Sequence, residues 1–402
     1  MRNPAVLFIV VTMVIDAMSI GLIIPVMPDL LEEVGASDLS RAALWGGVLS
    51  TTFAVMQFVF GPVLGGLSDR FGRRPVLLIS LAALAIDYLV MAVAGSIWLL
   101  LAGRIFGGIT AATQATANAY MADISAPEDR AANFGLLGAA FGVGFVLGPL
   151  IGGVLAELGT RAPFYAAAFL SAANAVFGYF VLKETLNPEN RRSFSWRRAN
   201  PLGILLQLRQ LPGLGLLLWV FFIYQVAFTV YPAIWSFFGK ERFGWDPATI
   251  GLSLGLFGIM LAIVQGVLIR PIMRFLGERG TVIYGHVFDI LAFIALALVT
   301  SGTVALILVP LAALAAVITP ALQGIMSKAV SADSQGELQG ALVSLSALAM
   351  IFSPMIMTGT FAAFTAPETA FYLPGAPFLL SALLVGIALA VFMKATRVML
   401  LR

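Results

Sequence analysis

The sequence has no cysteine and only one histidine, His286, in 402 residues. Without cysteine there is no disulfide and no thiolate metal site. A single histidine leaves little from which to build a metal centre or a nucleophile–base pair, and no phosphate-binding glycine loop is visible. We therefore expect neither an enzyme nor a resident metal or cofactor.

Charged residues are also scarce. Asp, Glu, Lys and Arg make up 11% of the chain and hydrophobic residues 60%, against about 25% and about 45–50% in soluble domains. A soluble protein of this length cannot bury so much apolar surface. The apolar runs far exceed the roughly 10 residues of a membrane β-strand, so a barrel is excluded. The composition predicts an all-α polytopic protein embedded in a lipid bilayer.

Twelve apolar segments are long enough to cross a bilayer as helices. The first contains Asp16 and is followed by no small-residue cleavage site, so we expect a retained helix and not a signal peptide. The twelve predicted spans are 5–28, 43–67, 76–95, 97–122, 132–156, 162–182, 213–238, 248–273, 281–301, 304–328, 337–364 and 375–395.

A polar, basic stretch divides the spans into two groups of six. It covers 183–212, includes Arg191, Arg192, Arg197 and Arg198, and predicts a cytoplasmic linker between bundles at 1–182 and 213–402. Eighteen of the 23 Lys and Arg residues fall on the linker's side of the predicted membrane. This asymmetry predicts that both termini are cytoplasmic, and it explains the net charge of +3 without a nucleic-acid partner.

The two groups of spans repeat one another. Four matches recur at offsets of 202 to 206 residues, and a nearly constant offset indicates two six-helix halves in parallel. That architecture predicts a substrate site between the halves at mid-membrane. The matches are Arg70–Arg74 with Arg274–Arg279, Ser125–Gly135 with Ser331–Gly340, Gly148-Pro149 with Ser353-Pro354, and Asp87 with Asp289.

Four charges lie well inside the predicted spans, away from the span ends: Asp16, Asp87, Arg104 and Asp289. Each costs about 2.5–3.5 kcal/mol on insertion scales, so each is a functional candidate that should face the protein interior or a water-filled cavity. A desolvated carboxylate binds and releases protons near neutral pH. The alternative is a structural ion pair of Asp16 or Asp87 with Arg104.

The single histidine precedes Asp289 by three residues, so the two share a helix face. A histidine titrates in the physiological range, which makes His286 a further candidate for proton handling. The alternative is a histidine at the membrane interface near the cytoplasmic end of the helix.

A loop of three arginines and one aspartate joins the second and third spans. Residues 65–75 read Gly-Gly-Leu-Ser-Asp-Arg-Phe-Gly-Arg-Arg-Pro. We interpret the loop as a conformational latch, with Asp69 near the helix start after Gly336, and with Arg73 or Arg74 pairing with Asp123. Positive-inside topology alone explains the arginines but neither Asp69 nor the glycines. The latch residues are Asp69, Arg70, Arg73, Arg74 and Asp123.

The fifth span carries small residues four apart and a proline, a pattern that favours close helix packing and a bend. Its residues are Gly144, Gly148, Pro149, Gly152 and Gly153.

Polar and aromatic residues in the spans are candidates for lining a cavity. Their mixture suits a planar, partly charged ligand, whereas Trp235 and Phe238 fit an aromatic belt at the interface. The cavity candidates are Gln57, Gln114, Asn118, Tyr224, Gln225, Tyr231 and Gln323.

These motifs resemble those of the major facilitator superfamily. Gly65–Leu78 is similar to its loop between helices 2 and 3, Gly103–Gly108 to its helix 4 motif, and Gly144–Gly153 to the helix 5 motif of antiporters. The whole pattern, including Asp16, Asp87-Tyr88 and Pro320–Gln323, resembles the twelve-helix tetracycline/proton antiporters of Gram-negative bacteria.

The resemblance implies a monomeric exporter in the bacterial inner membrane that works by alternating access. It implies uptake of a proton in exchange for a magnesium–tetracycline monocation, with the magnesium carried as part of the substrate. One departure stands out: that family has a histidine in helix 8 where this sequence has Leu261. The alternative function is a proton-coupled uptake symporter, or a facilitator, for a small metabolite.

Overall fold

The computed structural model describes residues 4–126, 128–187, 189, 191–195, 213–331 and 334–400. Most of the predicted linker, 196–212, lies outside these residues, and so do Arg197 and Arg198. Pro127, Ala332 and Asp333, which fall in one of the predicted repeat matches, also lie outside them.

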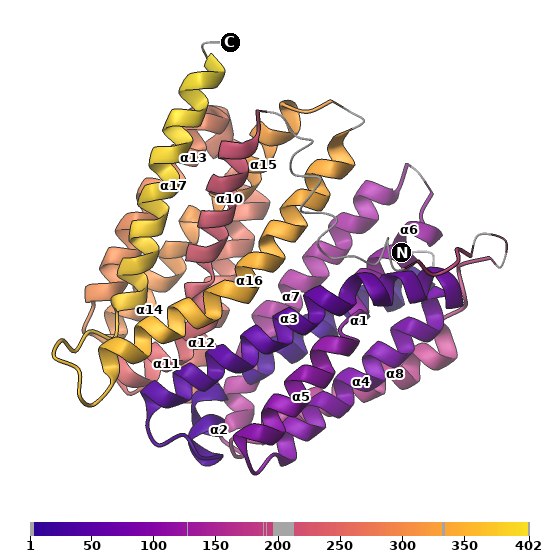
Figure 1. Cartoon of the computed structure of the whole chain (residues 1–402), viewed down its shortest axis with the longest axis horizontal. Coiled ribbons are helices and arrows are strands. Elements are labelled where there is room, and N and C mark those ends of the chain that lie inside the picture. Colours follow the sequence, from indigo (N-terminus) through magenta and orange to yellow (C-terminus); the bar gives the residue numbers. More distant parts are fainter. Residues whose placement is uncertain are drawn as a thin grey trace. The chain divides into compact units, whose positions relative to one another are not determined.

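The described residues form helices and no strand (Figure 1). Those of the first half are α1 (Pro4–Ile23), α2 (Met27–Glu33), α3 (Leu39–Phe71), α4 (Arg73–Val93), α5 (Ile97–Thr110), α6 (Thr113–Ile124), α7 (Arg130–Ala156) and α8 (Ala162–Val181). Those of the second half are α10 (Gly215–Phe228), α11 (Val230–Phe243), α12 (Pro247–Ile263), α13 (Ile269–Leu298), α14 (Gly302–Ala312), α15 (Ile318–Lys328), α16 (Gln335–Thr365) and α17 (Ala376–Leu400).

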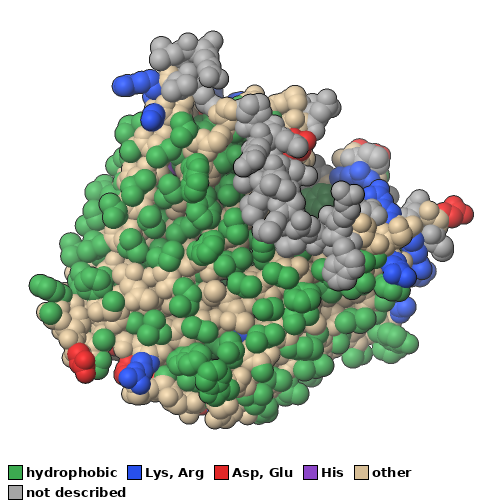
Figure 2. All heavy atoms as spheres, viewed as in Figure 1, with side chains coloured by type: hydrophobic (Ala, Val, Ile, Leu, Met, Phe, Trp, Pro, Cys, Tyr) green, Lys and Arg blue, Asp and Glu red, His purple; other side chains and the backbone are tan. Residues whose placement is uncertain are grey.

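Eleven helical segments of the described residues are long and apolar enough to cross a membrane. The sequence predicted twelve. The number is eleven because the predicted spans 248–273 and 281–301 fall within one helical run, Pro247–Leu298. A π-helical turn at Val264–Leu268 and a non-helical glycine, Gly277, interrupt that run without separating it. The chain is therefore an all-α, multi-pass membrane protein. On the face shown in Figure 2, hydrophobic side chains cover the helix flanks and charged side chains gather near the helix ends.

The described residues form two compact units. Unit 1 takes in 4–36, 52–195 and 246–252, and unit 2 takes in 37–51, 213–245 and 253–400. The units differ from the predicted bundles in two short segments, 37–51 and 246–252. The division of the chain at the linker stays a prediction.

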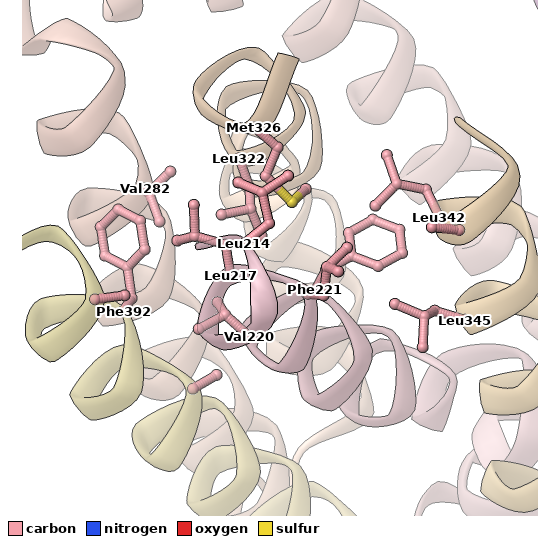
Figure 3. Close-up of a cluster of buried hydrophobic side chains, with 14 of the residues drawn as sticks. Leu214, Leu217, Val220, Phe221, Val282, Leu322, Met326, Leu342, Leu345 and Phe392 are labelled. Carbon is pink, nitrogen blue, oxygen red and sulfur yellow. The ribbon is translucent and has the colours of Figure 1, made fainter. Parts of the chain in front are cut away.

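Five buried core residues of unit 1 have buried counterparts at a constant offset in unit 2. Leu77, Ala117, Met121, Leu137 and Ala140 are buried together in unit 1. The residues 205 positions later are buried together in unit 2 (Figure 3): Val282, Leu322, Met326, Leu342 and Leu345. A constant offset through three helices of each unit shows that the halves repeat the same packing, as the weaker matches in the sequence indicated.

In unit 1, α1 lies against α7 (Figure 1) with almost no room between their backbones. A Cβ atom on Gly148 would lie 2.7 Å from the Cα of Gly21, and one on Gly144 would lie 2.9 Å from the backbone nitrogen of Met18. Glycines four residues apart on α7 therefore seat α1, as the small-residue pattern predicted. The equivalent place in unit 2 uses a hydrogen bond, in which the Ser353 hydroxyl donates to the Val226 carbonyl at 3.0 Å.

We expect Gly148→Ala to destabilise the protein, because its Cβ must push the α1 backbone away; overpacking of this kind costs about 1–3 kcal/mol. Gly142→Ala is the matched control, since a Cβ there meets nothing within 4 Å and alanine favours a helix by up to about 1 kcal/mol. Thermal unfolding in detergent measures both. Equal effects of the two substitutions would contradict the close approach of α1 and α7.

Candidate functional site

Asp87 and Arg104 form an ion pair inside unit 1. Asp87 lies on α4 and is completely buried, and the side chain of Arg104, on α5, is 12% exposed. Gly103 and Gly107, one on either side of Arg104 along α5, make room for the carboxylate: a Cβ on Gly107 would lie 2.7 Å from the Asp87 Cγ. Gly103 and Gly107 thus let α5 pack closely against the buried carboxylate of Asp87.

The pair does not use every polar atom. Asp87 Oδ1 and Arg104 Nε are buried and have no hydrogen-bond partner among the described residues. The Arg104 guanidinium also lies 5.1 Å from the centre of the Phe53 ring, in a cation–π contact. Of the two ion pairs that the sequence suggested for Arg104, the structure contains the one with Asp87.

Asp16 lies in the middle of α1 and is buried, at 9% exposure. Within the described part of the chain it has no hydrogen bond and no ion pair. The close approach of α1 to α7 places it, because Gly144 touches the Val14 carbonyl and Ala17 on either side of it. A carboxylate without a cation in such surroundings is costly to ionise.

Asp289 and His286 lie on α13 in unit 2, both at no more than 1% exposure. Asp289 Oδ2 and His286 Nε2 have no hydrogen-bond partner among the described residues. His286 lies among buried apolar side chains in the interior of unit 2.

The predicted cavity residues are spread over five helices. Tyr224 and Tyr231 are buried in unit 2, at 2% and 5% exposure, and the amide nitrogen of Gln225 donates to the Ser346 hydroxyl at 3.2 Å. Three candidates belong to unit 1: Gln57 on α3, and Gln114 and Asn118 on α6; Gln323 lies on α15. Their role as a substrate cavity stays a prediction. Trp235 and Phe238, expected at an interface, are buried at 1% or less.

The charged loop between α3 and α4 is one residue long. Gly72 alone separates the helices, and its φ of 112° is a conformation that suits glycine. Arg73 follows and holds both nearby carboxylates: its Nη1 lies 2.6 Å from Asp69 Oδ1, and its Nε lies 3.2 Å from Asp123 Oδ2. The helix turn, the end of α3 and the end of α6 are therefore joined through one guanidinium.

Arg70 and Arg74 do not share this network. Arg74 donates from Nη2 to the Tyr179 carbonyl at 2.7 Å, and its guanidinium lies over the Tyr179 ring. Arg70 is exposed and lies over the ring of Phe71, 5.1 Å from its centre. Neither forms an ion pair with a described residue.

Glu184 is a member of this network that the sequence did not reveal. Its carboxylate accepts from the backbone N–H groups of Arg73, at 2.9 Å, and Arg74, at 3.2 Å, which begin α4. It also accepts from the N–H groups of Thr185 and Leu186, both at 3.0 Å. A carboxylate capping free N–H groups at a helix start is favourable. The only signal in the sequence is a Glu just after the sixth span, which is typical of a solvated helix end.

Unit 2 repeats the turn with the charges exchanged. Gly277 has a φ of 67° and corresponds to Gly72, 205 residues earlier. At the same offset Glu278 stands for Arg73 and Lys328 for Asp123, and Lys328 Nζ lies 2.8 Å from Glu278 Oε1. The Lys328 side chain is 72% exposed and that of Arg73 is 13% exposed. Because exposed pairs contribute less than about 1 kcal/mol, the unit 1 turn is the more firmly held.

Among the described residues, no group of three or more His, Cys, Asp or Glu side chains is placed to hold a metal ion.

Known proteins resemble this chain over most of its length. The family profile of the Major Facilitator Superfamily matches residues 9–354. "Tetracycline resistance protein, class C" of Escherichia coli is 44% identical over 361 residues, 90% of each chain. The class D protein of Salmonella ordonez is 38% identical over 392 residues, covering 97% of this chain and 96% of the relative. The solved structure of the human organic anion transporter MFSD10 (TETRAN) has a TM-score of 0.69 at 26% identity, covering 97% of this chain and 99% of that one.

We expect Glu184→Gln to lower the free energy of unfolding by about 1 kcal/mol, because the α4 start loses a charged cap. Glu189→Gln, at a nearby exposed position, is the control. Thermal unfolding at two salt concentrations measures both, and the Glu184 effect should shrink with added salt. An effect no larger than that of the control would show that the cap contributes nothing.

Proposed function

The chain belongs to the major facilitator superfamily and, within it, to the family of the tetracycline resistance proteins, and we propose that it exports a tetracycline-like drug in exchange for protons. The observation that carries the proposal is the burial of Asp16 and Asp289 in apolar helices without a cationic partner among the described residues. In a chain 44% identical to a tetracycline resistance protein, such carboxylates are suited to bind a proton or a cation in turn.

Proton binding follows from the cost of the unpaired charge. A carboxylate inside an apolar bundle is stable when it is protonated, or when a cation lies beside it. Asp16 and Asp289 can therefore carry a proton inward in one half of the cycle and attract a cationic drug in the other. Protonation from outside releases the drug outward, and loss of the proton to the cytoplasm resets the carboxylate.

Asp87 takes a different part, because Arg104 already pairs with it. Removing one member of a buried pair costs about 3–5 kcal/mol, so the pair resists any change that separates its members. We propose that Arg104 keeps Asp87 ionised in one state of the cycle. When Asp87 takes up a proton, the ion pair is lost and the Arg104 guanidinium is released.

The substrate in this proposal is a planar monocation, such as a tetracycline that carries magnesium. The candidates for contacting it are Gln57, Gln114 and Asn118 in unit 1, and Tyr224, Gln225, Tyr231 and Gln323 in unit 2. Aromatic rings and amides suit a flat ligand with delocalised charge. The magnesium travels with the drug and is not a resident cofactor.

The turn around Gly72 acts as the latch. Arg73, held by Asp69, Asp123 and the Glu184 cap, keeps α3, α4 and α6 together as the protein alternates between its two states. We propose that this network stabilises the outward-facing state and takes no direct part in binding the drug.

The setting of the proposal is the inner membrane of a bacterium, with both termini in the cytoplasm and a monomer as the working unit. The alternatives, a proton-coupled uptake symporter or a facilitator for a small metabolite, are less consistent with relatives named for tetracycline resistance.

We expect everted membrane vesicles to accumulate tetracycline when a pH gradient is imposed, and Asp289→Asn to abolish that accumulation. If one monocation leaves for each proton that enters, the pH gradient alone drives export, at about 1.4 kcal/mol per pH unit. Collapsing the membrane potential should then change nothing. Asp129→Asn, at an exposed position, is the control. Unchanged accumulation in Asp289→Asn would show that Asp289 is not a coupling group, and absence of accumulation in the wild type would favour the facilitator. A dependence on potential would contradict one-for-one exchange.

We expect Asp69→Asn to slow export severalfold while leaving the affinity for the drug nearly unchanged, because Asp69 contacts Arg73 in the latch. Transport rates in vesicles and direct binding to the purified protein measure the two effects separately. A large loss of affinity would place Asp69 in the substrate site and overturn the latch.

A further inference from the structure

His286 occupies a position that the packing of the protein does not require to be polar. The residue 205 positions earlier is Leu81, buried at 1% exposure in the core of unit 1. His286 is buried at 0% at the corresponding place in unit 2. Because an apolar side chain fills this position in the other half, the imidazole adds a desolvation cost without a packing need. Packing alone therefore gives no reason for a histidine here.

The hydrogen bonding of the ring determines where its proton lies. His286 Nδ1 is 2.8 Å from the Val282 carbonyl oxygen. A carbonyl only accepts, so Nδ1 carries the hydrogen and Nε2 of the neutral ring is left with its lone pair. Nε2 is buried and has no partner among the described residues. The free nitrogen is thus a proton acceptor.

Neighbouring rings hold the imidazole in one orientation. The Phe392 ring of α17 is stacked on it, at 12° and 6.3 Å between centres, and the Tyr224 ring of α10 lies 5.8 Å away. Figure 3 shows Val282 and Phe392 side by side at the edge of the unit 2 core. A 3₁₀ turn, Ala313–Val317, precedes α15. Where these two elements approach α13, they contact Gly285 through Ile318 and the Ala315 carbonyl, neither of which titrates.

Other unpartnered polar groups lie along the same stripe of α13. Val282, His286, Asp289 and Phe293 follow at spacings of four, three and four residues, and all are buried. Phe293 lies 5.5 Å from the ring of Tyr231. Asp289 Oδ2 and the Tyr231 hydroxyl are buried without partners among the described residues, like His286 Nε2. Three polar groups that can pass or hold a proton are therefore buried without partners among the described residues of unit 2.

We propose that His286 is a second proton-binding group, which accepts the proton that Asp289 releases. This proposal rests on the drug/proton exchange described above. The O–H bond of protonated Asp289 breaks, its proton forms a bond to His286 Nε2, and a carboxylate and an imidazolium result. The imidazolium then gives the same proton to water and returns to the neutral ring. Three residues of α-helix rise about 4.5 Å, so the backbone positions of the two residues lie less than one turn apart along α13.

The predicted orientation gives this relay a direction. The start of α13 is expected on the cytoplasmic side, which places His286 between Asp289 and the cytoplasm. A proton that reaches Asp289 from outside therefore leaves through His286.

The chain's single histidine makes a direct test possible. In full-length protein labelled with ¹⁵N-histidine and placed in lipid nanodiscs, every imidazole signal belongs to His286. We expect the neutral ring to carry its hydrogen on Nδ1 and to take up a proton on Nε2 as the pH is lowered. In Asp289→Asn the midpoint should move downward, because the carboxylate that stabilises the imidazolium is gone. An imidazole that does not titrate, or one with the same midpoint in Asp289→Asn, would overturn the proposal.

Transport by His286→Phe gives the functional test, since phenylalanine keeps the packing against Tyr224 and Phe392. We expect tetracycline transport driven by a pH gradient to fall about tenfold or more, while drug binding and drug–drug exchange without a gradient stay as in the wild type. Tyr284→Phe, on the same helix, is the control. Normal gradient-driven transport by His286→Phe would overturn the relay. If this variant does not fold, the titration in wild type and Asp289→Asn decides alone.

The two proposals fail in different ways. If the wild-type protein moves no tetracycline in response to a pH gradient, the proposed substrate or coupling is wrong, whatever the imidazole does. If the wild type exchanges drug for protons but the His286 signal is insensitive to Asp289, only the relay is wrong.

Discussion

The cost of a charge inside an apolar bundle is the constraint on which the rest of this structure depends. The chain answers it in two ways within the described residues. Asp87 is buried against Arg104, and glycines on α5 make the space for that pair. Asp16 and Asp289 have no cation beside them among the described residues. Such buried carboxylates are stable only when they are protonated or when a cation binds next to them. The Asp87–Arg104 pair keeps its carboxylate neutralised by a fixed partner, whereas Asp16 and Asp289 can bind a proton or a cation in turn. An antiporter needs carboxylates of the second kind.

Close backbone contact is what holds these carboxylates in place. Asp16 has no polar partner among the described residues, so its position follows from the seating of α1 on the glycines of α7. In unit 2 the equivalent contact is a hydrogen bond from Ser353 to the Val226 carbonyl. The equivalent pair of helices is thus held by glycines that allow close backbone contact in one half, and by a serine hydrogen bond in the other.

The two halves repeat the same backbone and core but differ in a few polar and charged side chains. Core residues match at an offset of 205, and so do the glycine turns at Gly72 and Gly277. At that offset the ion pair beside the turn has its charges reversed. A shared backbone therefore carries opposite electrostatics at its two turns. His286, which replaces a core leucine of the first half, is a departure of the same kind within the membrane.

Much of this followed from the sequence alone, because apolar runs and their spacing are local properties. The scarcity of charge predicted a helical membrane protein, the intramembrane charges could be listed, and the small-residue stripe of α7 predicted close packing. Only the tertiary structure decided which groups meet. The pairing of Arg104 with Asp87, the capping of α4 by Glu184 and the burial of His286 each join residues distant in sequence or depend on which face a helix buries. The turn at Gly277 falls in the gap between the predicted spans 248–273 and 281–301. That the helical run continues through this gap was decided by the tertiary structure, because a single glycine ends a helix only where the packing on both sides requires it.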